Sequence, residues 1–244
     1  MAAVAALAAY AGPAVLFLSP VRAAVAPGLA GLGDPGHVAL TFDDGPHPRS
    51  TPHFLRLLAD SGTRATFFVL GRELARTPDL GREIVAGGHE IAVHGWDHRC
   101  FLRRSPSALY DDLARTVELV TRITGARPRW LRAPYGAFTT ASLFAARRLD
   151  LRPVLWTAWG FDWTSRATPF SVAATVHKGL RGGGTILLHD SDIAAAVGSW
   201  RSALGALPAI LAGCRDRGLA VGPLCEHGSL YGAGAVNRLD TTLV

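Results

Sequence analysis

The chain has 244 residues and a formal net charge of +6, with 25 Lys and Arg against 19 Asp and Glu. Lys178 is the only lysine, and the arginines are scattered along the sequence. This pattern argues against a nucleic-acid partner and fits an anionic cell-wall or membrane surface better. Three cysteines without C-x-x-C spacing predict neither a disulfide framework nor a thiolate metal site.

Residues 1–36 form an apolar N-terminal segment that Gly12, Pro13 and Pro20 interrupt. No Lys or Arg precedes the apolar run, so it lacks the charged start of a typical signal peptide, and the breaks make it marginal as a spanning helix. Three interpretations stay open: a signal peptide, a membrane anchor, or a helix that caps the following domain. The expected location is extracellular or membrane-associated, with the cytoplasm as the alternative.

Residues 37–226 alternate short apolar runs with stretches of helical period, which is typical of β-α units in a mostly parallel sheet. We predict strands at residues 37–42, 65–70, 89–93, 153–156 and 184–188. Predicted helices cover residues 51–61, 107–124, 139–148, 169–180 and 200–217. Residues 227–244 are expected to form a tail outside the core. The length suits one α/β domain, and the sequence leaves the oligomeric state open.

Ionisable side chains cluster where these apolar runs end. In parallel sheets and barrels, the carboxyl ends of the strands and the loops after them carry the chemistry. A purely structural protein has no need for such residues at one edge of its sheet, so the pattern predicts an enzyme. The residues concerned are Asp43, Asp44, His94, His98, Asp162 and His189.

Asp43 and Asp44 are adjacent carboxylates in a segment that breaks at Gly45 and Pro46. Neighbours on a regular strand face opposite sides, so both reach one site only if the backbone turns, which Gly45 allows. Two adjacent carboxylates repel each other, and a nearby cation would remove the conflict. An exposed turn is the alternative interpretation.

His94 and His98 are four residues apart, a spacing that places two imidazoles on one face of a helical turn. Gly95 stands where the zinc-protease motif H-E-x-x-H carries its glutamate, which argues against that class of enzyme. With Asp44, the two histidines would form a His-His-Asp set that leaves positions open for water and substrate. Such a set suits Zn, and Co, Mn or Fe are alternatives.

Taken together, residues 41–46, 94–98, 132–136, 161–163 and 186–190 resemble the five motifs of the polysaccharide deacetylase family, the NodB-homology carbohydrate esterases. The resemblance extends from His37 to Leu224. It implies a distorted (β/α) barrel and a metal-dependent hydrolase that removes N-linked, or O-linked, acetyl groups from a polysaccharide or amino-sugar oligomer. The alternatives are a deformylase or deacetylase of a lipid-linked or small amidated sugar, and a non-catalytic carbohydrate-binding protein.

The resemblance also implies roles for individual residues. Asp43 would be the general base, and the metal ligands would be Asp44, His94 and His98. Arg132 would pair with the base and fix its position.

The remaining motifs imply the second half of the reaction. The backbone N–H of Tyr135 would stabilise the oxyanion. His189, held by Asp162, would protonate the departing amine. The substrate-binding residues implied are Trp163, Leu187 and Pro134, of which the first two would form an apolar pocket for the acetyl methyl group.

Two positions depart from the family pattern. Gly95 stands where a Ser or Thr commonly follows the first motif histidine, and Trp159 stands where an aspartate is often found. Neither change removes an implied ligand or proton-transfer residue, so we predict that the protein is active.

Overall fold

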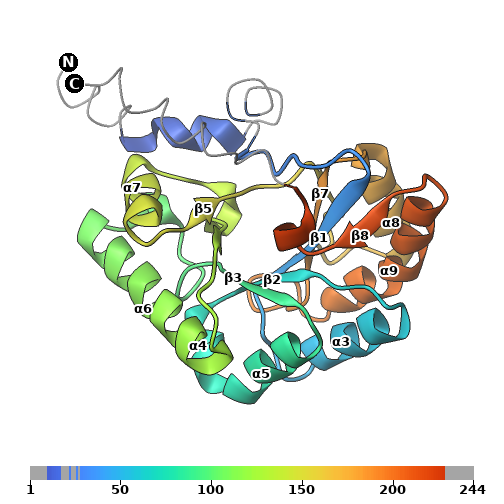
Figure 1. The fold of residues 1–244 in the computed structure, drawn as a ribbon, viewed down its shortest axis with the longest axis horizontal. Helices are drawn as coiled ribbons and strands as arrows, with labels where there is room; N and C mark the ends of the chain where they lie inside the picture. The colour runs from blue at the N-terminus through green and yellow to red at the C-terminus, as the bar shows by residue number, and fades with distance from the viewer. Residues whose placement is uncertain (1–9, 18–21, 23–25, 27, 229–244) are drawn as a thin grey trace.

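The structure, a computed structural model, describes residues 10–17, 22, 26 and 28–228. Its sheet has the strand order β5-β4-β3-β2-β1-β7-β6, and β8 pairs with the start of β1. All of these pairs are parallel. Figure 1 shows the strands at the centre of the molecule with helices packed around the outside. This confirms the predicted distorted (β/α) barrel.

The strands are β1 (His37–Asp43), β2 (Thr66–Val69), β3 (Glu90–Val93), β4 (Trp130–Leu131), β5 (Arg152–Pro153), β6 (Ala158–Trp159), β7 (Thr185–His189) and β8 (Ala220–Gly222). The α-helices are α3 (Thr51–Asp60), α4 (Gly71–Arg76), α5 (Pro78–Ala86), α6 (Pro106–Thr124), α7 (Thr140–Arg148), α8 (Pro169–Gly179) and α9 (Trp200–Arg215). Short 3₁₀ helices are η1 (Gly12–Phe17), η2 (Phe101–Arg103), η3 (Pro134–Gly136) and η4 (Leu224–Glu226).

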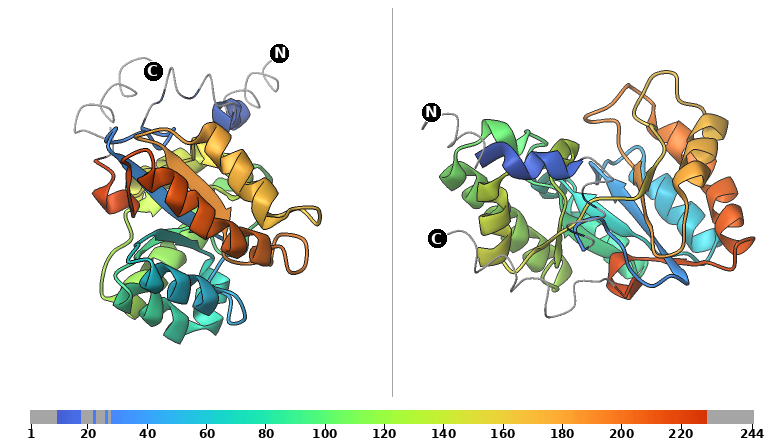
Figure 2. Two further views of the ribbon diagram at one scale, coloured as in Figure 1. Left: turned by 90° about the vertical axis from the view of Figure 1, so that its right-hand side faces the viewer. Right: turned by 90° about the horizontal axis from the view of Figure 1, so that it is seen from above.

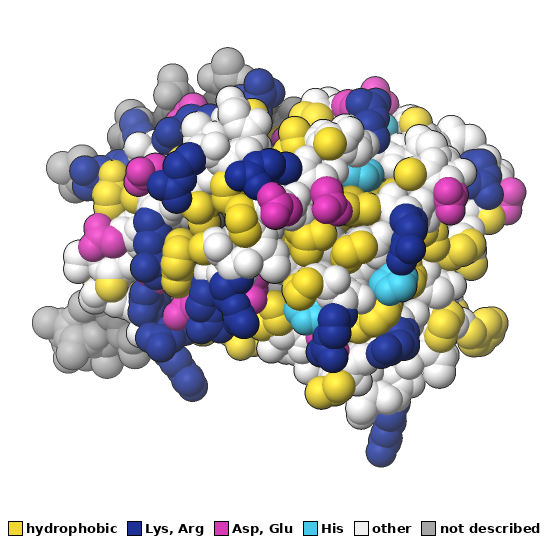
Figure 3. Space-filling model, turned by 90° about the horizontal axis from the view of Figure 1, so that it is seen from below, with side chains coloured by type: hydrophobic (Ala, Val, Ile, Leu, Met, Phe, Trp, Pro, Cys, Tyr) yellow, Lys and Arg dark blue, Asp and Glu magenta, His cyan; other side chains and the backbone are white. Residues whose placement is uncertain are grey.

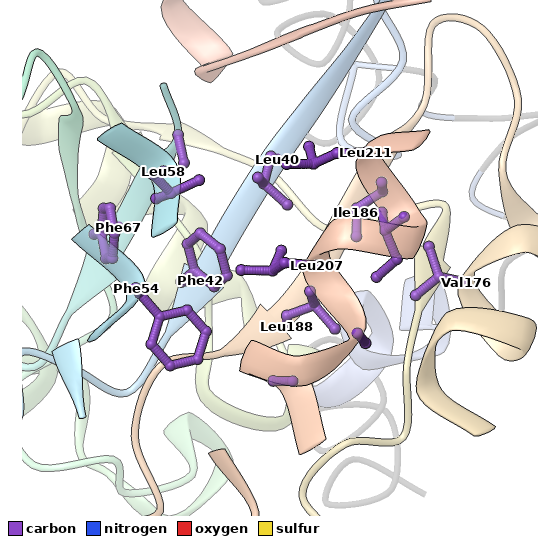
Figure 4. Packing of buried hydrophobic residues seen from close by; sticks show 14 of the residues in the cluster. Leu40, Phe42, Phe54, Leu58, Phe67, Val176, Ile186, Leu188, Leu207 and Leu211 are labelled. Carbon is purple, nitrogen blue, oxygen red and sulfur yellow. The ribbon is translucent and has the colours of Figure 1, made fainter. Parts of the chain in front are cut away.

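Strand β1 is central to the core because both of its faces are covered. Leu40 and Phe42 are fully buried and belong to the cluster that contains Phe54 of α3 and Leu207 of α9, as Figure 4 shows. Since side chains alternate along a strand, Thr41 and Asp43 face the opposite side, toward the interior of the barrel. Burial of the apolar face therefore fixes the direction of Asp43.

Most predicted elements are confirmed to within two residues at each end. Helix α6 shows why the local signals work. The hydroxyl of Ser105 accepts a hydrogen bond from the backbone N–H of Ala108 at 3.3 Å, and Gly125 ends the helix with a φ of 73°. These are the N-cap and the left-handed C-terminal residue that such sequences favour.

The predicted strand at residues 153–156 is wrong beyond its first residue, because β5 ends at Pro153. The backbone N–H groups that follow donate to three different segments: Val154 to Leu131 of β4, Leu155 to Leu29 near the N-terminus, and Thr157 to Thr185 of β7. A run that changes partner at almost every residue cannot form a regular ladder. This segment connects β5 and β6, the two strands at the ends of the sheet order.

Helices α4 and α5 were not predicted. Thr77 and Pro78 divide residues 71–86 into two short pieces, and neither is long enough to show a clear helical period. Both helices lie outside the sheet beside α6 (Figure 1).

The described part of the N-terminal segment packs against the domain. Helix η1 lies beside α7 (Figure 2), and the hydroxyl of Tyr10 donates to the carbonyl oxygens of Phe101 at 3.3 Å and Arg104 at 2.8 Å. Among the described residues, none of the helices has the length and apolar character needed to cross a bilayer. Much of the predicted N-terminal segment, and the predicted tail beyond Gly228, lie outside the described residues.

The surface charge agrees in part with the scattered arginines of the sequence. On the face drawn in Figure 3, some Lys and Arg side chains gather at the left of the view, and the others are spread between hydrophobic side chains.

Candidate active site

The two aspartates reach one site because the backbone turns at the end of β1. The turn lies at Asp44, which has a φ of 76°, a left-handed conformation that non-glycine residues rarely adopt. This corrects the expectation that Gly45 makes the turn. Gly45 is required for space instead, because a Cβ at this position would overlap the carboxylate of Asp190.

His94 and His98 do not lie on a helical turn, which corrects the second expectation from the sequence. Residues 94–100 are irregular, and Gly95 and His98 have φ values of 88° and 57°. These two left-handed residues fold the loop back so that both imidazoles face Asp44. A Ser or Thr at position 95 would be strained in this backbone conformation, so glycine suits this position.

Asp44, His94 and His98 converge on one point at the edge of the sheet. The Asp44 Oδ1 atom lies 3.4 Å from His94 Nε2 and 3.2 Å from His98 Nε2. One atom from each residue can be chosen so that all lie within 4.8 Å of one another. Two ligands at ~2.0–2.1 Å from a tetrahedral zinc ion are about 3.3–3.4 Å apart, so these separations suit a shared ion.

The surroundings of this set favour metal binding. Asp44 Oδ1 is buried and has no hydrogen-bond partner among the described residues. His94 Nδ1 lies 2.9 Å from the carbonyl oxygen of Arg132, so Nδ1 carries the proton and Nε2 presents its lone pair. Burial acts to raise the pKa of Asp44, but the contact with His94 and the charge of His98 outweigh it and lower the pKa. The carboxylate is therefore ionised, as a ligand must be.

Asp43 is held by Arg132 on the other side of this set. Arg132 is completely buried, and its Nη1 donates to Asp43 Oδ1 at 2.7 Å and to Thr41 Oγ1 at 2.8 Å. Its Nη2 donates to the carbonyl oxygen of Leu155 at 3.0 Å. Asp43 Oδ2 stays directed toward the site, 3.7 Å from His94 Nε2. The arginine therefore fixes one carboxylate oxygen and leaves the other available.

His189 and Asp162 form a second pair beside Asp43. His189 Nδ1 lies 3.1 Å from Asp162 Oδ1, and the backbone N–H of His189 donates to Asp162 Oδ2 at 2.7 Å. Asp43 and His189 are register partners in β1 and β7, so they sit side by side at the sheet edge. Burial acts to lower the pKa of His189, but the charge and hydrogen bond of Asp162 dominate and raise it to about 10.

The remaining predicted residues surround this centre. Tyr135 has a φ of 59°, and its ring packs on His98 with centroids 4.7 Å apart. The ring of Trp163 lies 5.6 Å from that of His189. Leu187 and Pro134 are buried on the strand and loop that carry His189 and Tyr135.

Two residues of the site, Thr41 and Asp190, were not predicted from the sequence. Thr41 faces the same side of β1 as Asp43, a two-residue spacing that could have revealed it. Asp190 is fully buried, and its carboxylate accepts a hydrogen bond from the Thr51 hydroxyl and packs against Gly45. Burial raises the pKa of Asp190 to about 7. Asp190 follows His189 in the sequence, and this position does not predict a contact with the turn at Asp43–Pro46.

One cavity lies away from this set. It has a volume of about 500 Å³ and lies at the amino ends of the strands, where His89, Glu90, Arg127 and Cys225 line it. It shares no residue with the set described above.

Comparisons with known proteins agree with this geometry. The sequence profile of the family described as polysaccharide deacetylase matches residues 31–154. The chain is 37% identical to a chitooligosaccharide deacetylase of Bradyrhizobium, over 63% of this chain and 70% of that protein. It is 34% identical to a peptidoglycan-N-acetylglucosamine deacetylase of Listeria monocytogenes, over 63% of this chain and 32% of that longer protein.

A solved structure shows the same fold. It is a mutant, with restored enzymatic activity, of a pseudoenzyme of carbohydrate esterase family 4 from Bacillus anthracis. Its TM-score to this chain is 0.71 and its sequence identity 25%, over 79% of this chain and 67% of that one. The chain belongs to the polysaccharide deacetylase family, carbohydrate esterase family 4, whose deacetylases are hydrolases that cleave amide bonds.

Proposed function

We propose that this protein is a metal-dependent deacetylase that removes N-linked acetyl groups from amino sugars of a glycan. The observation that carries the proposal is the convergence of Asp44, His94 and His98 at the strand ends that also carry two further pairs, Asp43 with Arg132 and His189 with Asp162. Amide hydrolysis needs both a base and an acid at the reacting group, since an amine leaves only when it is protonated.

The ion that suits the site best is Zn²⁺. Two imidazole nitrogens and one carboxylate oxygen are three protein ligands, and catalytic zinc sites keep a further position open. Co, Mn and Fe can be held by the same ligands. When bound, such an ion polarises the amide oxygen and lowers the pKa of its water to roughly 7.

Asp43 acts in the first half of the reaction. Its Oδ2 atom takes the proton from the attacking water, while Arg132 holds Oδ1 in place. The backbone N–H of Tyr135 donates to the oxygen that becomes negatively charged, a contribution of about 3–4 kcal/mol in comparable sites.

His189 acts in the second half. Because Asp162 accepts from Nδ1, the Nε2–H of the imidazolium is free to protonate the nitrogen of the departing amine. Trp163 and Leu187 line the space for the acetyl methyl group.

The substrates we propose are N-acetylglucosamine oligomers of the chitin or peptidoglycan type. The names of the Bradyrhizobium and Listeria relatives support this substrate class. We also propose that the protein works outside the cytoplasm, at the cell wall or the membrane surface. Its positive net charge is suited to such anionic surfaces.

The proposal is tested by measuring acetate release from chitooligosaccharides, peptidoglycan and O-acetylated xylan, with and without a chelator. We expect release from an N-acetylated glycan, loss of activity on chelation, and recovery when Zn²⁺ or Co²⁺ is added. Full activity in metal-free protein would contradict the metal-dependent mechanism, and release from xylan alone would contradict the choice of an amide substrate.

A further inference from the structure

Three aromatic side chains cluster beside the general acid. The ring centroids of Trp159 and Phe161 are 4.3 Å apart, those of Trp159 and Trp163 are 4.9 Å apart, and those of Phe161 and Trp163 are 5.1 Å apart. The Trp163 ring in turn contacts His189. Trp159, Phe161 and Trp163, which we call the aromatic platform, therefore form a cluster that begins beside the His189 imidazole and whose rings are tilted by 37–46° to one another.

The chain that carries the platform alternates between the interior and the surface. Gly160 and Asp162 are buried, whereas Phe161 is exposed and the two tryptophans are partly exposed. A Cβ at Gly160 would overlap Val172 and come within 3.0 Å of Leu188. Asp162 must point inward to hold His189, so the odd-numbered aromatic residues are directed outward.

The conformation of Phe161 is not one that packing alone would favour. Its side chain is 44% exposed and its φ is 51°, a value that is unusual for a bulky residue. Residues held in such conformations concentrate at functional sites. An aromatic ring in water next to a catalytic residue offers apolar contact area to a ligand.

The loop after β7 lies against this segment. The backbone N–H of Ala196 donates to the carbonyl oxygen of Trp163 at 3.0 Å, and the Thr164 hydroxyl donates to the carbonyl oxygen of Phe161 at 3.3 Å. These bonds hold the backbone under the platform, so its rings are positioned before a ligand arrives.

We propose that the aromatic platform is a subsite for the pyranose ring next to the sugar that is deacetylated. This inference rests on the proposed function and extends it to substrate length. One face of a pyranose ring presents C–H groups that stack on aromatic rings, while the hydroxyl groups at its edge stay hydrated. The platform therefore favours oligosaccharides over single sugars.

The test compares a long substrate with one that has no sugar. We measure kcat/KM of the full chain for chitotetraose and for 4-nitrophenyl acetate, and take the ratio of the two. Loss of one ring contact in Phe161→Ala should lower this ratio about five- to tenfold, the size expected for an aromatic pair. Phe161→Leu keeps apolar bulk without the ring and should lower it in the same direction.

Phe144→Ala is the matched control. Phe144 is an exposed phenylalanine on α7 (63% exposed) that is outside the aromatic platform, so the ratio should not change. Thermal unfolding of each variant shows whether it is folded. An unchanged ratio in both Phe161 variants, or an equal loss on both substrates, would overturn the proposal.

A binding measurement separates this inference from the proposed function. Titration of the protein with chitotetraose, followed by tryptophan fluorescence, requires no turnover. We expect a fluorescence change in the wild-type protein and a Kd about five- to tenfold weaker in Phe161→Ala. If chitotetraose binds the wild-type protein and binds Phe161→Ala more weakly, but no acetate is released from any glycan, the platform is supported and the proposed function is refuted. If it does not bind chitotetraose, the platform is refuted.

Discussion

Replacing Asp162 with Asn tests the assignment of His189 as the general acid. In the structure, one carboxylate oxygen of Asp162 accepts from the backbone N–H of His189 and the other from Nδ1. The carbonyl oxygen of an Asn must take the first bond, so its amide NH₂ faces Nδ1. Two N–H donors cannot face each other at this distance. Nδ1 must then be an acceptor, and the imidazolium form is disfavoured.

The expected change is large. The pKa of His189 should fall from about 10 to 6.5 or below, and this difference corresponds to about 5 kcal/mol. At pH 8 the fraction of protonated His189 falls from nearly all to roughly 3% or less. We expect kcat to fall by about 10²–10⁴, the range for loss of general acid catalysis or of the correct tautomer.

Two assays check this prediction. Acetate release as a function of pH gives kcat and the position of its alkaline limb, and an NMR titration of the metal-free protein gives the pKa of His189. Asp192→Asn is the control, because Asp192 accepts from the backbone N–H of Gly198 and an Asn oxygen can do the same. A kcat within threefold of wild type in Asp162→Asn, or a wild-type His189 pKa near 6.5, would refute the reasoning.

Three further predictions concern stability. Arg132→Met leaves the buried Asp43 carboxylate unpaired, so denaturant unfolding should show a loss of about 3–5 kcal/mol, and a loss below about 1 kcal/mol would contradict a buried pair. Gly45→Ala places a Cβ against Asp190 and should lower the unfolding free energy by about 1–3 kcal/mol; an unchanged melting temperature would argue against this contact. His89 is buried, which lowers its pKa to about 4 from 6.5. The unfolded chain therefore takes up this proton first as the pH falls. Stability should drop between pH 6.5 and 4, by up to about 3 kcal/mol from this group, and His89→Gln should flatten the drop. An equal slope of stability against pH in the wild-type protein and in His89→Gln would contradict this contribution of His89.

The sequence predicted the barrel well because the strands that carry it are continuous apolar runs. In β1 and β7 both faces are covered, and each strand contains three consecutive apolar residues, 38–40 and 186–188, which identify it as a buried strand. Residues 153–156 are just as apolar, yet the backbone N–H groups of residues 154–157 donate in turn to β4, to Leu29 and to β7. The apolar character of a segment predicts that it is buried, but it does not predict with which strand its backbone groups form hydrogen bonds.

In the site, too, the side chains involved could be predicted from the sequence and the backbone geometry could not. The motifs identified which side chains gather at the sheet edge, but the backbone geometry that brings them together depends on Asp44, Gly95 and His98 in left-handed conformations. A two-residue or four-residue spacing predicts a shared face only within a regular element. Asp190 was missed for a related reason, because its contact with Gly45 joins the ends of two strands that are distant in the sequence.

The central claim is that one divalent ion binds to Asp44, His94 and His98. A crystal of the protein grown with zinc, with diffraction data collected on both sides of the zinc absorption edge, tests it directly. We predict one anomalous peak at bonding distance, about 2.0–2.2 Å, from the Asp44 carboxylate and both Nε2 atoms, and no peak there in Asp44→Asn. A zinc ion bound elsewhere, or a site that stays empty in the wild-type protein at saturating zinc, would contradict the account.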